Sequence, residues 1–234
     1  MDALALLASE PERAAIFLDI DGVLAPIVPH PDDARVPDDT REVLRGLAQR
    51  YALVACVTGR ASDSARAIVG VPELTYVGEH GLELEPEAEE WAPRIREFAA
   101  AAAWETEDKP LTAAFHYRTA PDPDEAREAL EDVAAAALDE GFRTRWGRMV
   151  LEVLPPVQAS KGTAVRRLLE RHGLRRALYA GDDTTDLDGF AALDGLEAAV
   201  RIAIVSPEGP AELGERADFV VGSTAAFVEL LRQL

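Results

Sequence analysis

The chain has 234 residues, of which 48% are hydrophobic and 29% are charged, and its formal net charge is −19. This is the composition of a globular protein. This acidic balance disfavours nucleic acid and an anionic membrane as partners, because either would need a basic face on the protein. An anionic small molecule stays compatible if cationic side chains gather at one place. The single cysteine, Cys56, excludes an internal disulfide and is expected to be a buried, inert thiol.

The N-terminal segment MDALALLASE lacks the basic start of a signal peptide. No apolar stretch reaches the roughly 18 residues that a membrane-spanning helix needs. We therefore expect a soluble, cytoplasmic protein, and we expect a monomer.

The basic residues are unusually biased, because 22 are arginine and only Lys109 and Lys161 are lysine. Lysine differs from arginine in carrying a compact ammonium group, which suits sites that a planar guanidinium does not fit. The two lysines are therefore candidate functional residues, although chance retention is the alternative.

Short apolar runs alternate with helical patterns in the first and last thirds of the chain. Strands are predicted at residues 14–20, 52–57, 176–180, 200–205 and 218–221, and helices at 38–50, 160–172 and from 224 onward. Buried strands that alternate with helices indicate a parallel sheet covered on both faces, a Rossmann-like α/β fold.

The middle of the chain has a different pattern. Strands are predicted at residues 111–118, 142–146 and 149–154, with alanine-rich helices at 95–104 and 124–138. This indicates a smaller inserted α/β domain, an antiparallel sheet backed by helices. We expect a catalytic core formed by residues 1–82 and 156–234 and an inserted cap at 83–155, with the stiff Pro155-Pro156 pair at the return crossing.

Polar turns follow three of the predicted parallel strands, at the edge where such sheets bind ligands. They contain Asp19 and Asp21, then Thr58-Gly59-Arg60, then residues 181–186 (GDDTTD), while Lys161 opens a helix. Each element alone is also typical of a turn or a helix cap. Together they place several carboxylates at one edge, which favours a bound Mg²⁺ and phosphoryl transfer through an attacking carboxylate.

These elements resemble the four motifs of the haloacid dehalogenase superfamily, here DIDGV, VTGR, Lys161 and GDDTTD. Longer segments are similar to trehalose-6-phosphate phosphatases over essentially the whole chain. They are FLDIDGVLAPI at 17–27, GEHG at 78–81, EDKPLTAAFHYR at 107–118, VLEVLPP at 150–156 and GDDTTDLDGF at 181–190. Two departures are Val23 in place of the usual threonine and Leu154 in place of a common arginine.

The resemblance implies a role for each matching residue. It makes Asp19 the nucleophile and Asp21 the general acid and base. Other implied phosphoryl-binding residues are Thr58, Gly59, Lys161 and Arg60, with pairing to a carboxylate as the alternative for Arg60. The implied metal ligands are Asp19, Asp21, Asp182, Asp183 and Asp186, and the implied sugar-binding residues are Glu107, Lys109, His116, Arg118 and Glu152.

The function implied by the resemblance is Mg²⁺-dependent hydrolysis of trehalose 6-phosphate through an aspartyl-phosphate, with a trehalose-6-phosphate synthase as a candidate pathway partner. One alternative is a phosphatase for a sucrose, glucosylglycerol or mannosylglycerate phosphate. Others are a phosphorelay receiver and a non-catalytic Mg²⁺-binding domain. The basic run RTRWGR at 143–148 is expected to be a solvated strand face, and Trp91, Trp104 and Trp146 are expected in the cap core.

Overall fold

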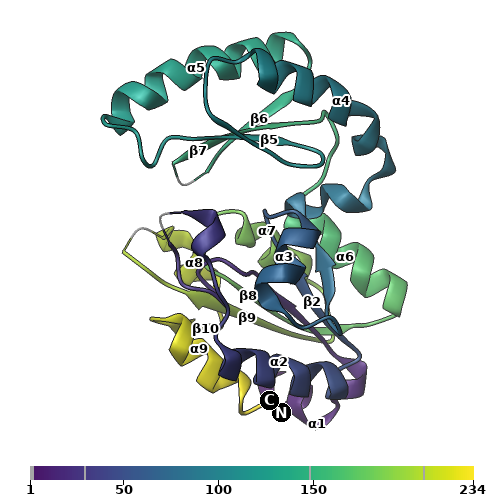
Figure 1. Ribbon diagram of the computed structural model, residues 1–234. Helices are drawn as coiled ribbons and strands as arrows, with labels where there is room; N and C mark the ends of the chain where they lie inside the picture. Colours follow the sequence, from purple (N-terminus) through teal and green to yellow (C-terminus); the bar gives the residue numbers. More distant parts are fainter. Residues whose placement is uncertain (1–2, 29, 148, 208) are drawn as a thin grey trace. The chain divides into compact units, whose positions relative to one another are not determined.

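Two units make up the computed structural model of this protein, which describes residues 3–28, 30–147, 149–207 and 209–234. Unit 1 combines Met1–Gly81 with Ala159–Leu234, and unit 2 is Leu82–Gln158. Figure 1 shows both units with the elements labelled along the chain.

Unit 1 is built on a six-stranded parallel sheet of order β10-β9-β8-β1-β2-β3. The central strand β1 pairs with β2 on one side and β8 on the other, which places their carboxyl ends at the same edge. The bounds are β1 Ala15–Leu18, β2 Leu53–Val57, β3 Thr75–Val77, β8 Arg176–Gly181, β9 Ala198–Ile204 and β10 Phe219–Val221.

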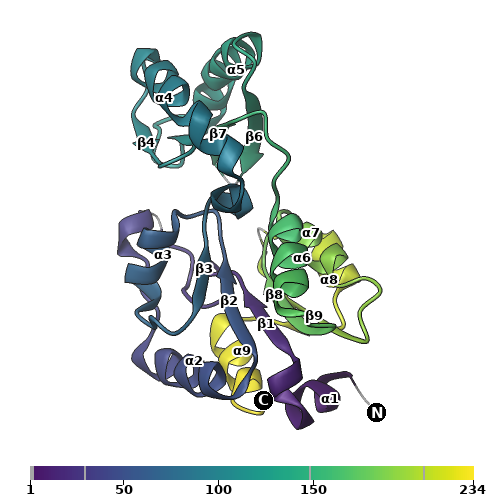
Figure 2. The ribbon, with the colours of Figure 1, turned by 90° about the vertical axis from the view of Figure 1, so that its right-hand side faces the viewer.

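Helices cover both faces of this sheet (Figure 2). Helices α2, α3 and α9 lie on one face and α6, α7 and α8 on the other. Alternate residues of β1 supply the two cores, since Ile16 and Leu18 belong to the cluster under α2 and α9 whereas Ala15 and Phe17 point away from it. The bounds are α1 Ala3–Ser9, α2 Asp38–Arg50, α3 Ser62–Val69, α6 Lys161–His172, α7 Asp186–Ala192, α8 Ala211–Arg216 and α9 Thr224–Leu231.

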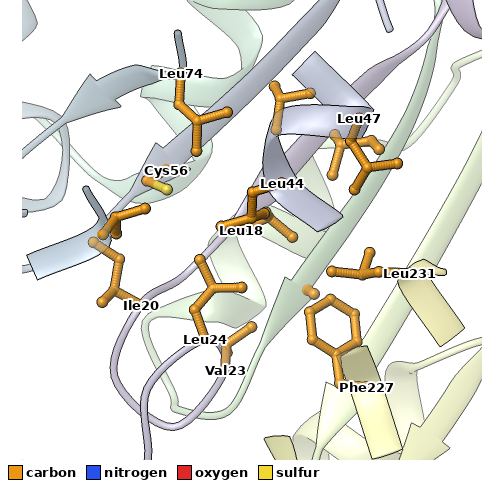
Figure 3. Packing of buried hydrophobic residues seen from close by; sticks show 14 of the residues in the cluster. Leu18, Ile20, Val23, Leu24, Leu44, Leu47, Cys56, Leu74, Phe227 and Leu231 are labelled. Carbon is orange, nitrogen blue, oxygen red and sulfur yellow. The ribbon is translucent and has the colours of Figure 1, made fainter. Parts of the chain in front are cut away.

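Figure 3 shows the apolar packing beneath the sheet, where Leu18, Leu44 and Phe227 converge from β1, α2 and α9. Cys56 lies in this cluster, as expected, and its burial raises the pKa of the thiol. Ile20, Val23 and Leu24 of the turn that follows β1 belong to the same cluster, so a buried apolar core supports that turn.

Unit 2 is a four-stranded antiparallel sheet of order β4-β5-β7-β6. Its core lies between the sheet and two helices and includes Ile95, Leu130, Phe115, Leu151 and Val153. The bounds are β4 Thr106–Asp108, β5 Ala113–His116, β6 Arg143–Gly147, β7 Val150–Leu154, α4 Pro86–Ala101 and α5 Pro123–Asp139.

The predicted fold class is confirmed. The differences concern element ends, short strands and four helices of unit 1 for which no range was predicted, α1, α3, α7 and α8. Helix α4 begins at Pro86 rather than residue 95, because a proline is accepted in the first turn of a helix and the alanine-rich segment continues from it. Strands β3 and β4, with three residues each, were not predicted. In the described part of the chain, no helix combines the length and apolar character needed to span a membrane.

Candidate active site

The first polar turn follows β1 and carries Asp19 and Asp21. Asp19 continues the sheet, since its amide donates to the carbonyl of Ala180 on β8 (3.0 Å), and its Oδ1 accepts from the amide of Ile20 (2.7 Å). The chain then reverses at Gly22, whose φ of +81° suits glycine. A Cβ at Gly22 would lie 2.2 Å from Oδ2 of Asp182, so glycine lets the turn approach the loop after β8.

Lys161 is the first residue of α6 and is only 2% exposed. A reciprocal cap between Ser160 and Thr163 fixes this helix start, with Ser160 accepting from the Thr163 amide and Thr163 accepting from the Ser160 amide. The Nζ of Lys161 donates to Oδ2 of Asp19 (2.6 Å) and to Oδ1 of Asp186 (2.7 Å). The ammonium thus bridges the loops after β1 and β8.

Asp186 is fully buried and accepts four hydrogen bonds. Its Oδ1 accepts hydrogen bonds from Nζ of Lys161 and from the hydroxyl of Tyr179 (2.8 Å). Its Oδ2 accepts from the amides of Asp182 and Asp183 (2.9 Å each). Four donors match the acceptor capacity of a carboxylate. This arrangement suits a residue that holds Lys161 and the loop after β8 in place.

The electrostatics of the cluster follow from its burial. Burial raises the pKa of Asp19, the charge of Lys161 opposes that rise, and Asp186 adds to it. Burial alone would lower the pKa of Lys161, but the charges of Asp186 and Asp19 outweigh it and raise the pKa overall. Lys161 is therefore a cation at every physiological pH.

The second polar turn, after β2, carries Thr58, Gly59 and Arg60. The backbone of the GEHG segment holds it, because the amide of His80 donates to the Thr58 carbonyl (2.8 Å) and the amide of Glu79 donates to the Arg60 carbonyl (2.9 Å). A Cβ at Gly59 would lie 2.4 Å from Nε2 of His80, so a side chain at Gly59 would collide with the imidazole. His80 thus packs against the turn predicted to bind phosphate.

Arg60 binds Asp21 through two hydrogen bonds. Its Nε donates to Oδ2 and its Nη2 donates to Oδ1, both at 2.7 Å. The structure therefore shows the carboxylate pairing that was the alternative to phosphate binding for Arg60. Two fixed donors orient the Asp21 carboxylate before any substrate is present.

Three carboxylates of unit 1 could hold a metal ion. Oxygens of Asp19, Asp182 and Asp186, all buried, lie within 4.8 Å of one another. An all-oxygen donor set is the chemistry that Mg²⁺ prefers, so these residues fit the predicted ion. Because all four acceptor positions of Asp186 have donors, Asp19 and Asp182 are the better ligands. Asp183 is half-buried, and its Oδ1 accepts from the Thr184 amide (2.7 Å).

A second polar cluster lies on the sheet face of unit 2 opposite its helices. The strand register places Glu107, Ala114, Glu152 and Arg145 in one row across β4, β5, β7 and β6. Residues paired in this way project to the same side of a sheet. The row therefore brings together polar groups from three strands around one small residue.

Four of the predicted sugar-binding residues gather there. Lys109 donates from Nζ to Oε1 of Glu152 (3.1 Å), and Nε2 of His116 lies 2.8 Å from Oε2 of Glu107. The side chains of Lys109 and Glu152 are 11% and 8% exposed. Arg118, the fifth, lies in the turn after β5 and outside the row.

The expectation of a solvated face for RTRWGR is wrong for Arg145. Its Nε and Nη2 donate to Oε2 of Glu152 at 2.9 and 2.6 Å. Arg143 donates to the Val157 carbonyl (2.6 Å), and Arg148 lies outside the described residues. Trp91, Trp104 and Trp146 pack against the unit 2 core, as expected.

Comparison with known proteins agrees with the geometry. The fold is that of haloacid dehalogenase-type hydrolases: a haloacid dehalogenase-like hydrolase from Bacteroides thetaiotaomicron superposes with a TM-score of 0.66 at 14% identity, covering 94% of this chain and 98% of that one. The C-terminal domain of Candida albicans trehalose-6-phosphate phosphatase gives a TM-score of 0.76 at 21% identity, with 99% and 95% covered.

The sequence comparisons identify the family. The trehalose-phosphatase family model matches residues 17–217. A probable trehalose-phosphate phosphatase D from Arabidopsis thaliana is 30% identical over 89% of this chain and 67% of its own length. Probable trehalose-phosphate phosphatase 9 from Oryza sativa subsp. japonica is 33% identical over 80% of this chain and 61% of its own length. The chain belongs to the trehalose-phosphatase family, a family of phosphatases.

Proposed function

We propose that this chain hydrolyses trehalose 6-phosphate to trehalose and phosphate, with Mg²⁺ and through an aspartyl-phosphate on Asp19. The observation that carries the proposal is the position of Asp19. It is a buried carboxylate at the end of the central strand, held by Lys161 and by a backbone amide, beside two further buried carboxylates and two residues before Asp21.

The chemistry divides between Asp19 and Asp21. A carboxylate oxygen of Asp19 attacks phosphorus, the bond from phosphorus to the sugar oxygen breaks, and Asp21 gives a proton to that oxygen. A water molecule then attacks phosphorus, its proton passes to Asp21, and the bond from phosphorus to Asp19 breaks. Arg60 takes one acceptor position on each oxygen of Asp21, so a second position on each oxygen is left to carry the proton.

Three features of unit 1 support phosphoryl binding. Lys161 supplies a permanent positive charge beside the nucleophile. Thr58, 1% exposed, lies in a turn whose backbone is fixed by the GEHG segment. A bound Mg²⁺ would supply positive charge against the carboxylates and the transferring phosphoryl group.

The charge balance of the polar cluster on the sheet of unit 2, which includes Glu107, Lys109, Arg145 and Glu152, supports a neutral sugar as the other end of the substrate. Glu107 and Glu152 carry two negative charges, and Lys109 and Arg145 carry two positive charges. Such a row offers hydrogen-bond donors and acceptors to hydroxyl groups without net attraction for a second charge. This favours trehalose 6-phosphate over mannosylglycerate phosphate, whose sugar part has an additional carboxylate.

A panel of sugar phosphates tests the proposal. Phosphate release from the trehalose, sucrose, glucosylglycerol and mannosylglycerate esters is compared at equal concentrations with Mg²⁺ and after chelation. We expect the highest kcat/KM for trehalose 6-phosphate and no turnover after chelation. Preference for another sugar overturns the substrate, and activity in thoroughly chelated protein overturns the metal requirement.

A further inference from the structure

Arg145 contacts a predicted sugar-binding residue from a segment that was expected to be solvated. Two nitrogens of its guanidinium converge on Oε2 of Glu152, at 2.9 and 2.6 Å. Lys109 donates to the other oxygen, Oε1, at 3.1 Å. Glu152 is therefore held at both oxygens by cations that come from opposite sides of its strand.

The strand register explains why Arg145 and not its neighbour takes this place. Arg145 lies directly opposite Glu152 in the β6–β7 pair, whereas Arg143 lies opposite Leu154. Both arginines project to the same side of β6, because residues two apart share a face. Arg143 donates instead to the backbone carbonyl of Val157.

Two points of attachment restrict the Glu152 side chain more than one would. Glu152 is nearly buried, with 8% of its side chain exposed, and Arg145 is one-quarter exposed. Charge-assisted hydrogen bonds from a planar guanidinium fix the orientation of a carboxylate as well as its position. Without Arg145, the Oε2 end loses these two donors, and the orientation of the Glu152 carboxylate is restricted less.

We propose that Arg145 is a positioning residue for sugar recognition, which acts by holding Glu152 and, through it, Lys109 in the orientation that binds the sugar hydroxyls. The proposal rests on the proposed function, since it assigns Glu152 and Lys109 to the sugar. It adds a residue on β6 to the determinants of substrate specificity.

The first test compares Arg145→Met with Arg143→Met. Both variants remove one positive charge from the same face of β6, and methionine keeps part of the aliphatic stem. We expect Arg145→Met to lower kcat/KM for trehalose 6-phosphate about 10- to 50-fold, mainly through KM, as loss of one partner of a hydrogen-bonded charge pair does. The fold-loss in kcat/KM of Arg145→Met on p-nitrophenyl phosphate should be at least tenfold smaller than its loss on trehalose 6-phosphate. Arg143→Met should stay within about twofold of the unmodified protein on both substrates.

The second test asks whether Arg145 acts through Glu152. In a Glu152→Ala background, adding Arg145→Met should change kcat/KM for trehalose 6-phosphate by less than about threefold, because the residue to be positioned is already absent. Arg145→Lys should recover part of the loss, since one ammonium can replace one of two donors. The proposal is overturned if the fold-loss in kcat/KM of the double variant equals the product of the two single losses. It is also overturned if Arg145→Met lowers kcat/KM equally on trehalose 6-phosphate and p-nitrophenyl phosphate.

The two proposals fail in different ways. If the unmodified protein prefers another sugar phosphate of the panel, the substrate assignment fails, and the same variants measured with that ester still test Arg145. If Arg145→Met keeps full selectivity for the preferred sugar phosphate, the positioning role fails while the phosphatase assignment stands. Thermal unfolding of Arg145→Met within a few degrees of the unmodified protein establishes that the variant is folded in either case.

Discussion

Removing the charge of Lys161 should destabilise the protein as well as inactivate it. In Lys161→Met, Asp186 keeps three of its four donors, but Asp19 keeps only the amide of Ile20 among the contacts described above. Taking one partner from a buried ion pair costs about 3–5 kcal/mol. In a chain of this size, that lowers Tm by roughly 6–20 °C.

The assay is thermal unfolding of chelated protein, followed by a titration with Mg²⁺. The divalent ion should return part of the lost stability, because it supplies positive charge to the same carboxylates. Arg166→Met is the matched control: it removes a charge from the exposed side of the same helix and should cost less than about 0.5 kcal/mol. Adding Asp19→Asn to Lys161→Met should recover much of the loss.

One result would refute this reasoning. If chelated Lys161→Met unfolds within 1–2 °C of the unmodified protein, a shift worth less than about 1 kcal/mol, the lysine does not compensate buried charge in the folded state. Catalysis gives a separate readout. Lys161→Arg keeps the charge but inserts a longer planar group among Asp19, Asp186 and the helix start, so kcat should fall by two orders of magnitude or more.

Other substitutions test the remaining steps. Asp19→Asn should abolish turnover on every phosphate ester, because an amide cannot attack phosphorus; residual activity near that of the unmodified protein would contradict the nucleophile. Because the pKa of Asp19 is raised in the folded state, its protonated carboxyl stabilises the fold at acid pH, and this stabilisation is lost as pH rises through that pKa. Asp19→Asn should therefore stabilise chelated protein more at pH 8 than at pH 4, as measured by the free energy of unfolding in urea. Glu152→Ala should reduce kcat/KM for trehalose 6-phosphate on the order of 10- to 1000-fold and lose far less on p-nitrophenyl phosphate; equal losses would assign Glu152 a structural role. Ala114→Leu should act in the same direction, because it places a larger side chain between Glu107 and Glu152 at a fully buried position, and a selectivity unchanged from the parent protein would exclude this row from the sugar site.

The sequence by itself determined the fold class and the location of the chemistry in unit 1. Buried apolar runs that alternate with helical patterns favour a parallel sheet covered on both faces, and the polar turns after three of these runs then lie at one edge of it. The bias against lysine also identified Lys161 and Lys109, and both form ion pairs with carboxylates in the structure. Of the three-residue strands, β3 and β4 were not predicted, because three residues are too few to show a period of two, whereas β10 was predicted at 218–221.

The tertiary structure decided which charged groups pair. Sequence left two roles open for Arg60, phosphate binding and pairing with a carboxylate, and the fold turns its guanidinium onto Asp21. It placed Asp186 among the metal ligands, which stays a prediction, and only the fold shows that this carboxylate also accepts from four donors around the loop after β8. Arg145 became visible only through the register of β6 and β7, since a shift of one residue would have sent it to the other face. Pairing of this kind depends on the distance in space between segments that are far apart in the chain or on either side of a turn. A local pattern of residues does not reveal these distances.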